Sequence, residues 1–363
     1  MRFLLFLAPL LIAAAPLPPA PPPRMPPAPP IIIAHRGASA ERPEHTLAAY
    51  ELAIEQGADF IEPDLVATKD HRLVARHENE ISGTTDVASR PEFASRKTTK
   101  TIDGETVTGW FTEDFTLVEL KTLRARERLP QLRPDNAAFD GQYAIPTLAE
   151  IIALAKAATQ RTGRTIGIYP ETKHPSYFRS LGLPLEPVLL AELAKADWTT
   201  RAAPVFIQSF EVDNLKALKG ETGVRLIQLM AASGRSADGH DYARLATAEG
   251  LKQVATYAAG IGPEKAMVIP RDAVGRLGKP TMLVADAHAA GLEVHPWTFR
   301  PENYFLPLEL KSGIDPRKAG DVDAEIRAFL ATGIDGLFSD STAAAVRALG
   351  SPRDPPRANP ARN

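Results

Sequence analysis

The chain has 363 residues, of which 44% are hydrophobic, and a formal net charge of −2 at pH 7. This length accommodates one large domain or two ordinary ones with a substantial core. The near-neutral charge gives no indication of nucleic acid or an anionic membrane surface as a partner. The sequence contains no cysteine, which excludes a disulfide framework and thiolate chemistry.

The N-terminus is typical of an exported protein. Met1 and Arg2 precede an almost wholly apolar run that ends in three alanines at Ala15. A basic start, a short apolar stretch and small residues predict a secretory signal peptide over residues 1–15, with a disordered apolar tail as the alternative. The run is too short for a membrane span, which needs ~20 apolar residues. We therefore expect export to the periplasm or the medium, without stable membrane insertion.

Two further terminal segments are expected to lie outside the fold. Residues 16–30, PLPPAPPPRMPPAPP, predict a proline-rich linker of polyproline II type. Residues 351–363 are rich in proline and arginine and are expected to form a disordered tail.

The first expected elements lie between residues 31 and 143. Residues 31–34, IIIA, form a continuous apolar run with three β-branched residues, which is typical of a strand buried on both faces. A helix is expected from Thr46 to Gly57, since glycine is favourable just past a helix C-terminus. A second strand over 60–65 leads into a hairpin over 66–76. Residues 82–143 lack regular apolar runs and are interpreted as an insertion beside the strand ends, with a short helix at 117–123.

Strand and helix patterns alternate after residue 143. We expect helices at 148–158, 189–196, 212–219, 251–259, 279–290, 323–332 and 342–349, and strands at 165–169, 204–208, 224–230, 267–269, 292–297 and 336–338. Repeated βα units imply parallel strands covered by helices. About eight strands, with close to the ~250 residues that a (β/α)₈ barrel needs, favour a TIM barrel with an insertion after the strand that carries His77. A doubly wound sheet is disfavoured because no G-x-G-x-x-G turn follows the first strand.

Three acidic side chains are expected at strand ends. Glu62 and Asp64 are two residues apart on one strand and therefore share a face, and Glu171 follows another strand. Carboxylates without a thiol or an obligatory imidazole favour a hard cation, Mg²⁺ or Ca²⁺, over zinc. The alternative is a set of salt-bridging acids. The apolar residues before Glu62 argue against it there, because an unpaired buried carboxylate is costly.

His35 and His77 are the candidates for acid–base catalysis. Each follows a short apolar strand, and imidazole titrates near neutral pH. A single histidine at a strand end is more often structural, but two of them beside three acids favour a catalytic role. Of the other histidines, His295 begins HPWTFR and could line the pocket or pack, whereas His45 and His174 show no partner in the sequence.

Arg36 and Lys173 add positive charge at the same expected edge of the sheet. Cations beside a metal site neutralise the non-bridging oxygens of a phosphate, although either residue alone could be a salt-bridge partner. Together with the three acids they favour a phosphate-containing substrate.

Several motifs resemble those of a known family. The segment HRGASAERPEHTLAAYELAIEQGADFIEPDLVATKDHRLVARHE resembles the opening of the glycerophosphodiester phosphodiesterases, particularly the periplasmic type. YPETK, IQSF, VHPWTFR and GIDGLFSD are similar to the later motifs of the family and occur in the same order. The resemblance extends from about Ile31 to about Gly350 and implies one TIM-barrel domain with an insertion after the second catalytic histidine. One departure is Glu78, where the family commonly has aspartate.

The resemblance also implies roles for individual residues. His35 and His77 match the acid–base histidines, and Arg36 and Lys173 match phosphate contacts. The ligands of one divalent cation, Ca²⁺ or Mg²⁺, match Glu62, Asp64 and Glu171, and Trp297 of VHPWTFR is assigned to substrate binding. The implied reaction is metal-dependent hydrolysis of a glycerophosphodiester to sn-glycerol 3-phosphate and an alcohol.

Two other functions fit part of the pattern. A related barrel phospholipase that acts on lipid phosphodiesters would be expected to carry an apolar, membrane-facing loop, whereas the segment 82–143 is polar. An exported protein that binds phosphodiesters without turnover would not need both His35 and His77. We therefore expect a small glycerophosphodiester as the substrate and no nucleic acid partner.

Overall fold

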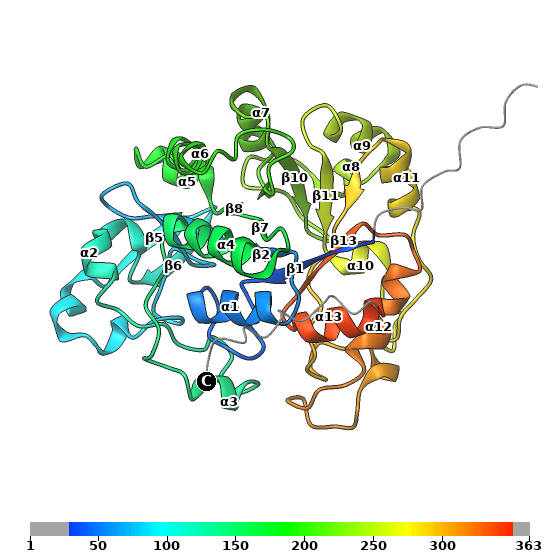
Figure 1. The fold of residues 1–363 in the computed structure, drawn as a ribbon, viewed down its shortest axis with the longest axis horizontal. Helices are drawn as coiled ribbons and strands as arrows, with labels where there is room; N and C mark the ends of the chain where they lie inside the picture. The colour runs from blue at the N-terminus through cyan, green and yellow to red at the C-terminus, as the bar shows by residue number, and fades with distance from the viewer. Residues whose placement is uncertain (1–28, 351–363) are drawn as a thin grey trace, which may run out of the picture.

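A ring of parallel strands forms the centre of the molecule. The computed structural model describes residues 29–350. Within that range, eight strand positions surround a common centre (Figure 1). In chain order they are β1 (Ile31–His35), β2 (Phe60–Glu62) continued by β3 (Asp64–Ala67), β7 (Gly167–Ile168) continued by β8 (Glu171–Thr172), β9 (Phe206–Ser209), β10 (Arg225–Met230), β11 (Gly260–Pro263), β12 (Glu293–Val294) and β13 (Gly336–Ser339).

The ring closes between its last strand and its first. β13 pairs in parallel with β1, with Ile31 opposite Gly336. On the other side of β13, the Phe299 amide donates a hydrogen bond to the Phe338 carbonyl, 2.9 Å away. Two strand positions are interrupted at Pro63 and Pro170, because proline has no amide hydrogen to donate to a neighbouring strand. The result is the (β/α)₈ arrangement that the alternating pattern predicts.

Helices cover the outside of the ring (Figure 1). Their ends follow from local sequence: α4 begins with a capping box formed by Thr147 and Glu150, and Gly163 ends it in the left-handed conformation. The longer helices are α1 (Leu47–Glu55), α4 (Leu148–Thr162), α6 (Glu186–Lys195), α7 (Val212–Glu221), α9 (Ala248–Val254), α11 (Leu283–Ala289), α12 (Val322–Leu330) and α13 (Thr342–Leu349). Shorter ones are α5 (Pro175–Ser180), α8 (Tyr242–Leu245) and α10 (Lys265–Val268).

Side chains fill the interior of the ring. A cluster of buried residues comes from six of the strand positions and consists of Ile33, Phe60, Tyr169, Phe206, Ile227 and Phe338. The rings of Tyr169 and Phe206 are stacked with centroids 4.9 Å apart. The ring of strands is therefore a packed core rather than a channel, and a small molecule can bind only at one of its ends.

Residues 76–147 form a separate lobe beside the ring, at the left of Figure 1. It follows β4 (Leu73–Ala75) and contains the hairpin of β5 (Thr98–Ile102) and β6 (Glu105–Gly109), together with α2 (Leu117–Leu120) and α3 (Pro134–Ala137). Although its sequence is polar, the lobe is anchored by buried aromatic side chains: Phe93, Trp110, Phe111 and Phe115. Hydrophobic contacts therefore hold it against the rest of the core.

One expected strand is wrong. Residues 267–269 do not form a strand; α10 covers Lys265–Val268, and the strand of this unit is β11 (Gly260–Pro263). A Cβ atom at Gly260 would lie 2.6 Å from the Glu293 carbonyl oxygen, so this strand needs glycine where the neighbouring backbone approaches. The apolar run Met267–Ile269 instead follows the strand as a helix. The helix expected at 251–259 correspondingly ends at Val254.

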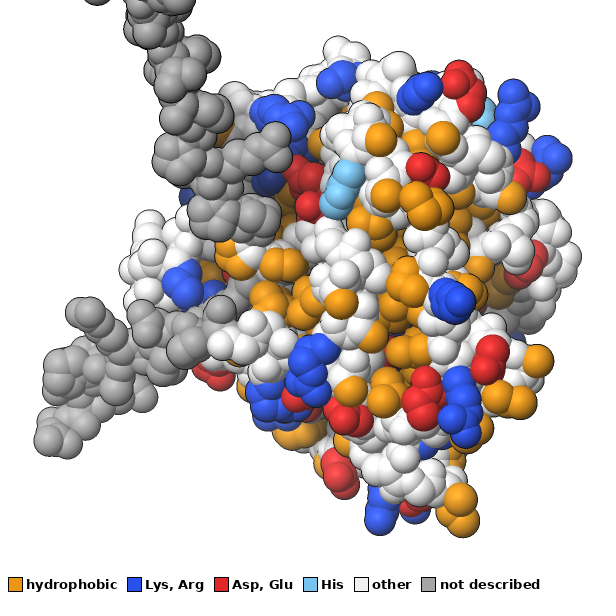
Figure 2. Space-filling model, turned by 90° about the vertical axis from the view of Figure 1, so that its right-hand side faces the viewer, with side chains coloured by type: hydrophobic (Ala, Val, Ile, Leu, Met, Phe, Trp, Pro, Cys, Tyr) orange, Lys and Arg blue, Asp and Glu red, His pale blue; other side chains and the backbone are white. Residues whose placement is uncertain are grey.

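One face of the molecule carries mixed charge. The face at the right-hand side of Figure 1 shows Lys, Arg, Asp and Glu interspersed with apolar side chains (Figure 2). No helix within residues 29–350 is long and apolar enough to cross a membrane. The predicted signal peptide, almost all of the proline-rich linker and the predicted C-terminal tail lie outside the described residues.

Candidate active site

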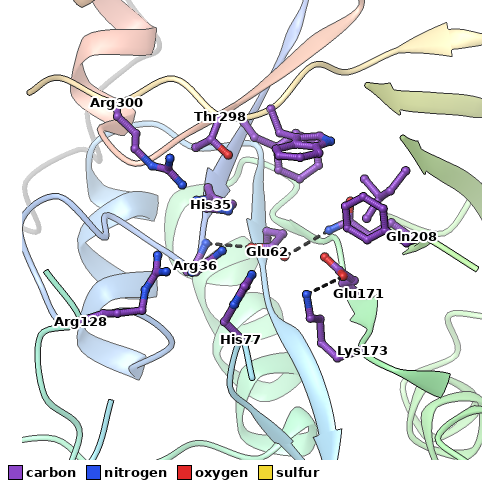
Figure 3. A pocket seen from close by; sticks show the side chains of 14 residues that line it. His35, Arg36, Glu62, His77, Arg128, Glu171, Lys173, Gln208, Thr298 and Arg300 are labelled. Carbon is purple, nitrogen blue, oxygen red and sulfur yellow. Dashed lines mark hydrogen bonds and ion pairs between the residues drawn. The ribbon is translucent and has the colours of Figure 1, made fainter. Parts of the chain in front are cut away.

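A cavity of about 240 Å³ lies where strands of the ring end (Figure 3). His35 ends β1, Glu62 ends β2 and Glu171 begins β8, so parallel strands bring these side chains to one end of the ring. The cavity is lined by His35, Arg36, Glu62, His77, Arg128, Glu171, Lys173, Gln208, Phe210, Leu229, Trp297, Thr298, Arg300 and Phe338. The two predicted histidines, two of the three acids and both predicted cations therefore surround one space.

The three acids form a buried carboxylate cluster. One oxygen each from Glu62, Asp64 and Glu171 lies within 4.8 Å of the others. Burial, together with the charge of neighbouring Asp64, raises the pKa of Glu62 well above its usual range, and burial raises the pKa of Glu171 to about 8. Burial opposes ionisation of Asp64 too, but Lys173 and a hydrogen bond from His45 hold its pKa well below the usual range. Carboxylates crowded in this way fit a hard divalent cation, which would neutralise their mutual repulsion.

Arg36 and Lys173 are tied to these carboxylates. Arg36 takes a left-handed backbone conformation with φ of +61°, which directs its amide at Glu62 Oε2, 2.8 Å away. Its guanidinium lies 3.3 Å from Asp64 Oδ2, and Lys173 Nζ lies 3.0 Å from Glu171 Oε1. Burial opposes both charges, but the surrounding carboxylates raise the pKa of both side chains, so both are cationic. They can therefore contact an anionic phosphate in the cavity.

His35 is held by a buried network of charges. Its Nδ1 donates a hydrogen bond to Asp340 Oδ1 at 2.6 Å, which leaves Nε2 as the unprotonated nitrogen when the ring is neutral. Asp340 also accepts hydrogen bonds from Arg133 at 2.6 Å and from Arg300 at 3.1 Å. Burial, reinforced by the charge of Arg36, lowers the pKa of His35 to about 4, so the imidazole is neutral at pH 7 and can accept a proton.

In Figure 3, His77 lies below Arg36, whereas His35 lies above it. Its Nδ1 is 2.7 Å from Glu78 Oε1, although the direction of the ring N–H falls outside hydrogen-bond geometry. Burial, with the charges of Arg36 and Lys173, lowers the pKa of His77 to about 3. A side chain that is 25% exposed nevertheless reaches solvent, so His77 is the more accessible of the two histidines.

Comparison with known proteins decides the family. The model of the glycerophosphoryl diester phosphodiesterase family matches residues 35–344. The chain belongs to this family. The enzyme is 38% identical over 329 residues to glycerophosphodiester phosphodiesterase GDPD6 of Arabidopsis thaliana, which covers 86% of this chain and 84% of that protein. It is 31% identical over 301 residues to a glycerophosphodiester phosphodiesterase of Haemophilus influenzae, over 75% and 79% of the two chains. The prediction of a phosphoric diester hydrolase of this family is confirmed.

Solved structures with the same fold come from related proteins. A putative glycerophosphoryl diester phosphodiesterase of Silicibacter pomeroyi aligns with a TM-score of 0.63 and 22% identity, over 89% of this chain and 94% of that one. A phosphodiesterase of Oleispira antarctica in complex with the product sn-glycerol-3-phosphate aligns with a TM-score of 0.59 and 20% identity, over 89% and 98%. At this identity the likeness bears on the fold, and it confirms the expected α/β barrel.

Trp297 lines the cavity with its ring face, a detail that could not be predicted from the sequence. It lines the wall beside Phe210, with ring centroids 5.8 Å apart. Its indole N–H donates to the Gly262 carbonyl at 2.8 Å and is therefore used within the barrel of the phosphodiesterase. Trp297 thus turns an apolar ring face to the cavity, and its indole N–H is already bonded within the barrel.

Several site residues of the enzyme escape sequence reasoning. His45 has no visible partner in the sequence, yet it is fully buried and donates from Nε2 to Asp64 at 2.9 Å, which orients that carboxylate. Asp340, the last residue of the GIDGLFSD motif, holds His35. The position of Asp340 just after an apolar strand was the available signal, as it was for Glu62. The other missed residues that line the cavity or bind its residues are Glu44, Arg128, Arg133, Gln208 and Arg300.

Proposed function

We propose that the enzyme hydrolyses glycerophosphodiesters to sn-glycerol 3-phosphate and an alcohol in the cavity that His35 and His77 share. The observation that carries the proposal is the placement of two histidines, two buried cations and a carboxylate cluster around one space. The names of the curated relatives and the product bound in the Oleispira antarctica structure support the choice of substrate.

The carboxylate cluster is the proposed site of one divalent cation. Glu62, Asp64 and Glu171 supply oxygen donors only, and oxygen donors favour Mg²⁺ or Ca²⁺. When bound, such an ion supplies Lewis-acid polarisation of substrate oxygens. His45 and Gln208 hold two of the carboxylates through hydrogen bonds at 2.9 and 3.1 Å and so fix the direction of the donor oxygens.

The proposed nucleophile is the glycerol hydroxyl next to the phosphate. A phosphodiester anion repels nucleophiles, and the sequence has no cysteine to attack it. One of the two histidines, in its neutral form, removes the hydroxyl proton and a new O–P bond forms. The bond to the alcohol breaks as the other histidine, which must be protonated beside the bound phosphate anion for this step, donates its proton to the leaving oxygen. Water then opens the resulting cyclic glycerol phosphate with the histidines in exchanged roles. Arg36 and Lys173 stabilise the negative charge that develops on the phosphate.

Replacement of either histidine tests this proposal. His35→Ala and His77→Ala should each lower kcat by roughly 10²–10⁴-fold with the fold retained, because each removes one proton-transfer group. A substrate analogue that lacks the neighbouring hydroxyl should be turned over poorly by the unaltered enzyme. Hydrolysis of the deoxy analogue at the rate of glycerophosphocholine would refute the internal nucleophile and favour direct attack by water.

The same assay separates the alternative functions. A phospholipase would prefer lipid phosphodiesters over glycerophosphocholine, and a binding protein would show no turnover. We further propose that residues 82–143, which lie in the lobe beside the ring, are the family insertion after the strand that carries His77. Export is proposed from the pattern of residues 1–15, and an intact N-terminus in mass spectra of the native protein would contradict it.

A further inference from the structure

A chain of four titratable side chains leads from the β5–β6 hairpin to His77 and includes His77 itself. His174 Nδ1 lies 2.6 Å from Asp103 Oδ2, at the tip of the hairpin. His174 Nε2 lies 3.2 Å from Glu78 Oε2, and the second oxygen of Glu78 lies 2.7 Å from His77 Nδ1. The chain crosses three segments that are distant in sequence: the turn of the hairpin, the residue before α5 and the end of β4.

Geometry fixes the charge of His174. Both of its ring nitrogens face carboxylate oxygens, which can only accept hydrogen bonds when ionised. Both nitrogens must therefore carry a proton, and His174 is an imidazolium. Burial opposes this charge, but the hydrogen bonds to Asp103 and Glu78 raise the pKa of His174 to about 9.

The backbone conformations at His174 and at Asp103 favour the contact between these two residues. His174 takes a left-handed conformation with φ of +46°, which is unfavourable for a residue with a Cβ atom and points to a constraint from its surroundings. Asp103 and Gly104 have φ of +50° and +87° and form the two-residue loop of a hairpin in which Ile102 pairs with Glu105. Asp-Gly is favoured in such loops, so the hairpin presents Asp103 in a defined position.

The position of the Glu78 carboxylate depends on a second partner besides the neighbouring His77. Its carboxylate is half exposed, and its contact with the adjacent residue His77 is not aligned as a hydrogen bond. The carboxylate therefore needs a second partner to stay at His77 Nδ1, and His174 supplies it. The extra methylene of glutamate, compared with aspartate, lets one carboxylate reach both rings.

We propose that Asp103 and His174 are positioning residues for His77: Asp103 holds His174 as an imidazolium, and His174 holds Glu78 against His77 Nδ1. This keeps the Nε2 atom of His77 directed at the cavity in one tautomer. The inference rests on the proposed acid–base role of His77. It gives the hairpin of the lobe a function in the reaction, although none of its residues lines the cavity.

Other charged groups also face His174. Lys173 precedes it, and Glu211 and Arg235 line an adjoining hollow together with Asp103 and His174. Lys173 opposes the charge of His174, whereas Asp103 and Glu78 favour it. Removing the charge of Asp103 should therefore lower the pKa of His174.

The test uses the full-length enzyme with glycerophosphocholine as substrate. Asp103→Asn and His174→Gln should each lower kcat by about 10-fold and leave KM within about twofold, a loss typical of residues that orient a functional histidine. The alkaline limb of the kcat–pH profile should move to lower pH in Asp103→Asn, since His174 then loses its proton earlier. The double variant should lose no more than the single ones, because both act through one contact chain.

Two matched controls separate positioning from general damage. Glu105→Gln removes an exposed carboxylate beside the same turn, and His288→Gln breaks a histidine–aspartate pair of 2.9 Å outside the cavity. Both should keep wild-type kcat and the wild-type alkaline limb. If Asp103→Asn disturbs the hairpin, His174→Gln still breaks the chain from α5.

Three outcomes would overturn the inference. They are wild-type kcat in His174→Gln, an unchanged alkaline limb in a folded Asp103→Asn, and additive losses in the double variant. A fully active His77→Ala would instead refute the proposed function itself. An inactive His77→Ala with unaffected Asp103 and His174 variants would refute only this inference.

Discussion

His35 and His77 line the same cavity, but the groups that hold them differ in burial and in their distance along the chain. His35 donates to Asp340, which is 2% exposed and binds the guanidinium groups of Arg133 and Arg300. His77 contacts Glu78, whose side chain is 49% exposed and whose second partner is His174. One histidine is fixed by the closed ring, the other by a lobe outside it.

This difference in burial affects how strongly each set of charged groups interacts and how each set responds to pH. Charges that are buried together interact strongly, and removing one of them leaves an uncompensated charge in the interior. Half-exposed ion pairs are screened by water and salt and contribute little to stability. We therefore expect the charges around His35 to remain in place at neutral and alkaline pH, whereas those around His77 should change at alkaline pH, where His174 loses its proton.

The largest effect should come from removing the divalent cation proposed for the carboxylate cluster. Chelator should abolish activity, and Ca²⁺ or Mg²⁺ should restore it, because the three buried carboxylates of the cluster offer oxygen donors for such an ion. Glu62→Gln should weaken binding of the metal, measured by calorimetry, with the circular dichroism spectrum unchanged. Full activity of the dialysed enzyme in excess chelator would remove the metal from the reaction.

An intermediate effect should distinguish the two carboxylates that hold the histidines. Asp340→Asn should lower the free energy of unfolding by roughly 3–5 kcal/mol, because it breaks a buried network around Arg133 and Arg300. Glu78→Gln should change it by no more than about 1 kcal/mol, since the side chain of Glu78 is itself half exposed. Urea unfolding of both variants measures the difference, and equal losses would contradict the comparison.

The smallest effect should be that His35 and His174 make the free energy of unfolding depend on pH in opposite directions. The pKa of folded His35, about 4, lies below that of the unfolded chain, so its contribution to stability falls as pH drops from about 6.5 to 4. The pKa of folded His174, about 9, lies above it, so its contribution is complete below about pH 6.5 and is lost as pH rises through 9. Urea unfolding at about pH 5, 7 and 9 should show that His35→Gln reduces the acidic loss, to which the buried His77 and His295 also contribute, and that His174→Gln reduces the alkaline one. His288→Gln serves as the reference, and slopes of equal sign would contradict the assignment.

The sequence by itself determined most of the barrel and the candidates for chemistry. Continuous apolar runs such as residues 31–34 depend only on neighbouring residues, and so does the shared face of Glu62 and Asp64. The position of His35 after such a run was enough to place it at a strand end. The predicted strand at 267–269 was wrong because β11 is rich in glycine, and its need for glycine comes from the close backbone of β12.

The tertiary structure alone decided the partners of these residues. Asp340 lies 305 residues from His35, and only the pairing of β13 with β1 brings their side chains together. Asp103 lies 71 residues from His174, and His45 meets Asp64 across a helix. Hydrophobic periodicity is a local property that a sequence displays directly, whereas an ion pair depends on where two distant segments meet. Closure of the ring and packing of the lobe bring these distant partners together. They therefore also determine the charge and the orientation of each histidine in the site.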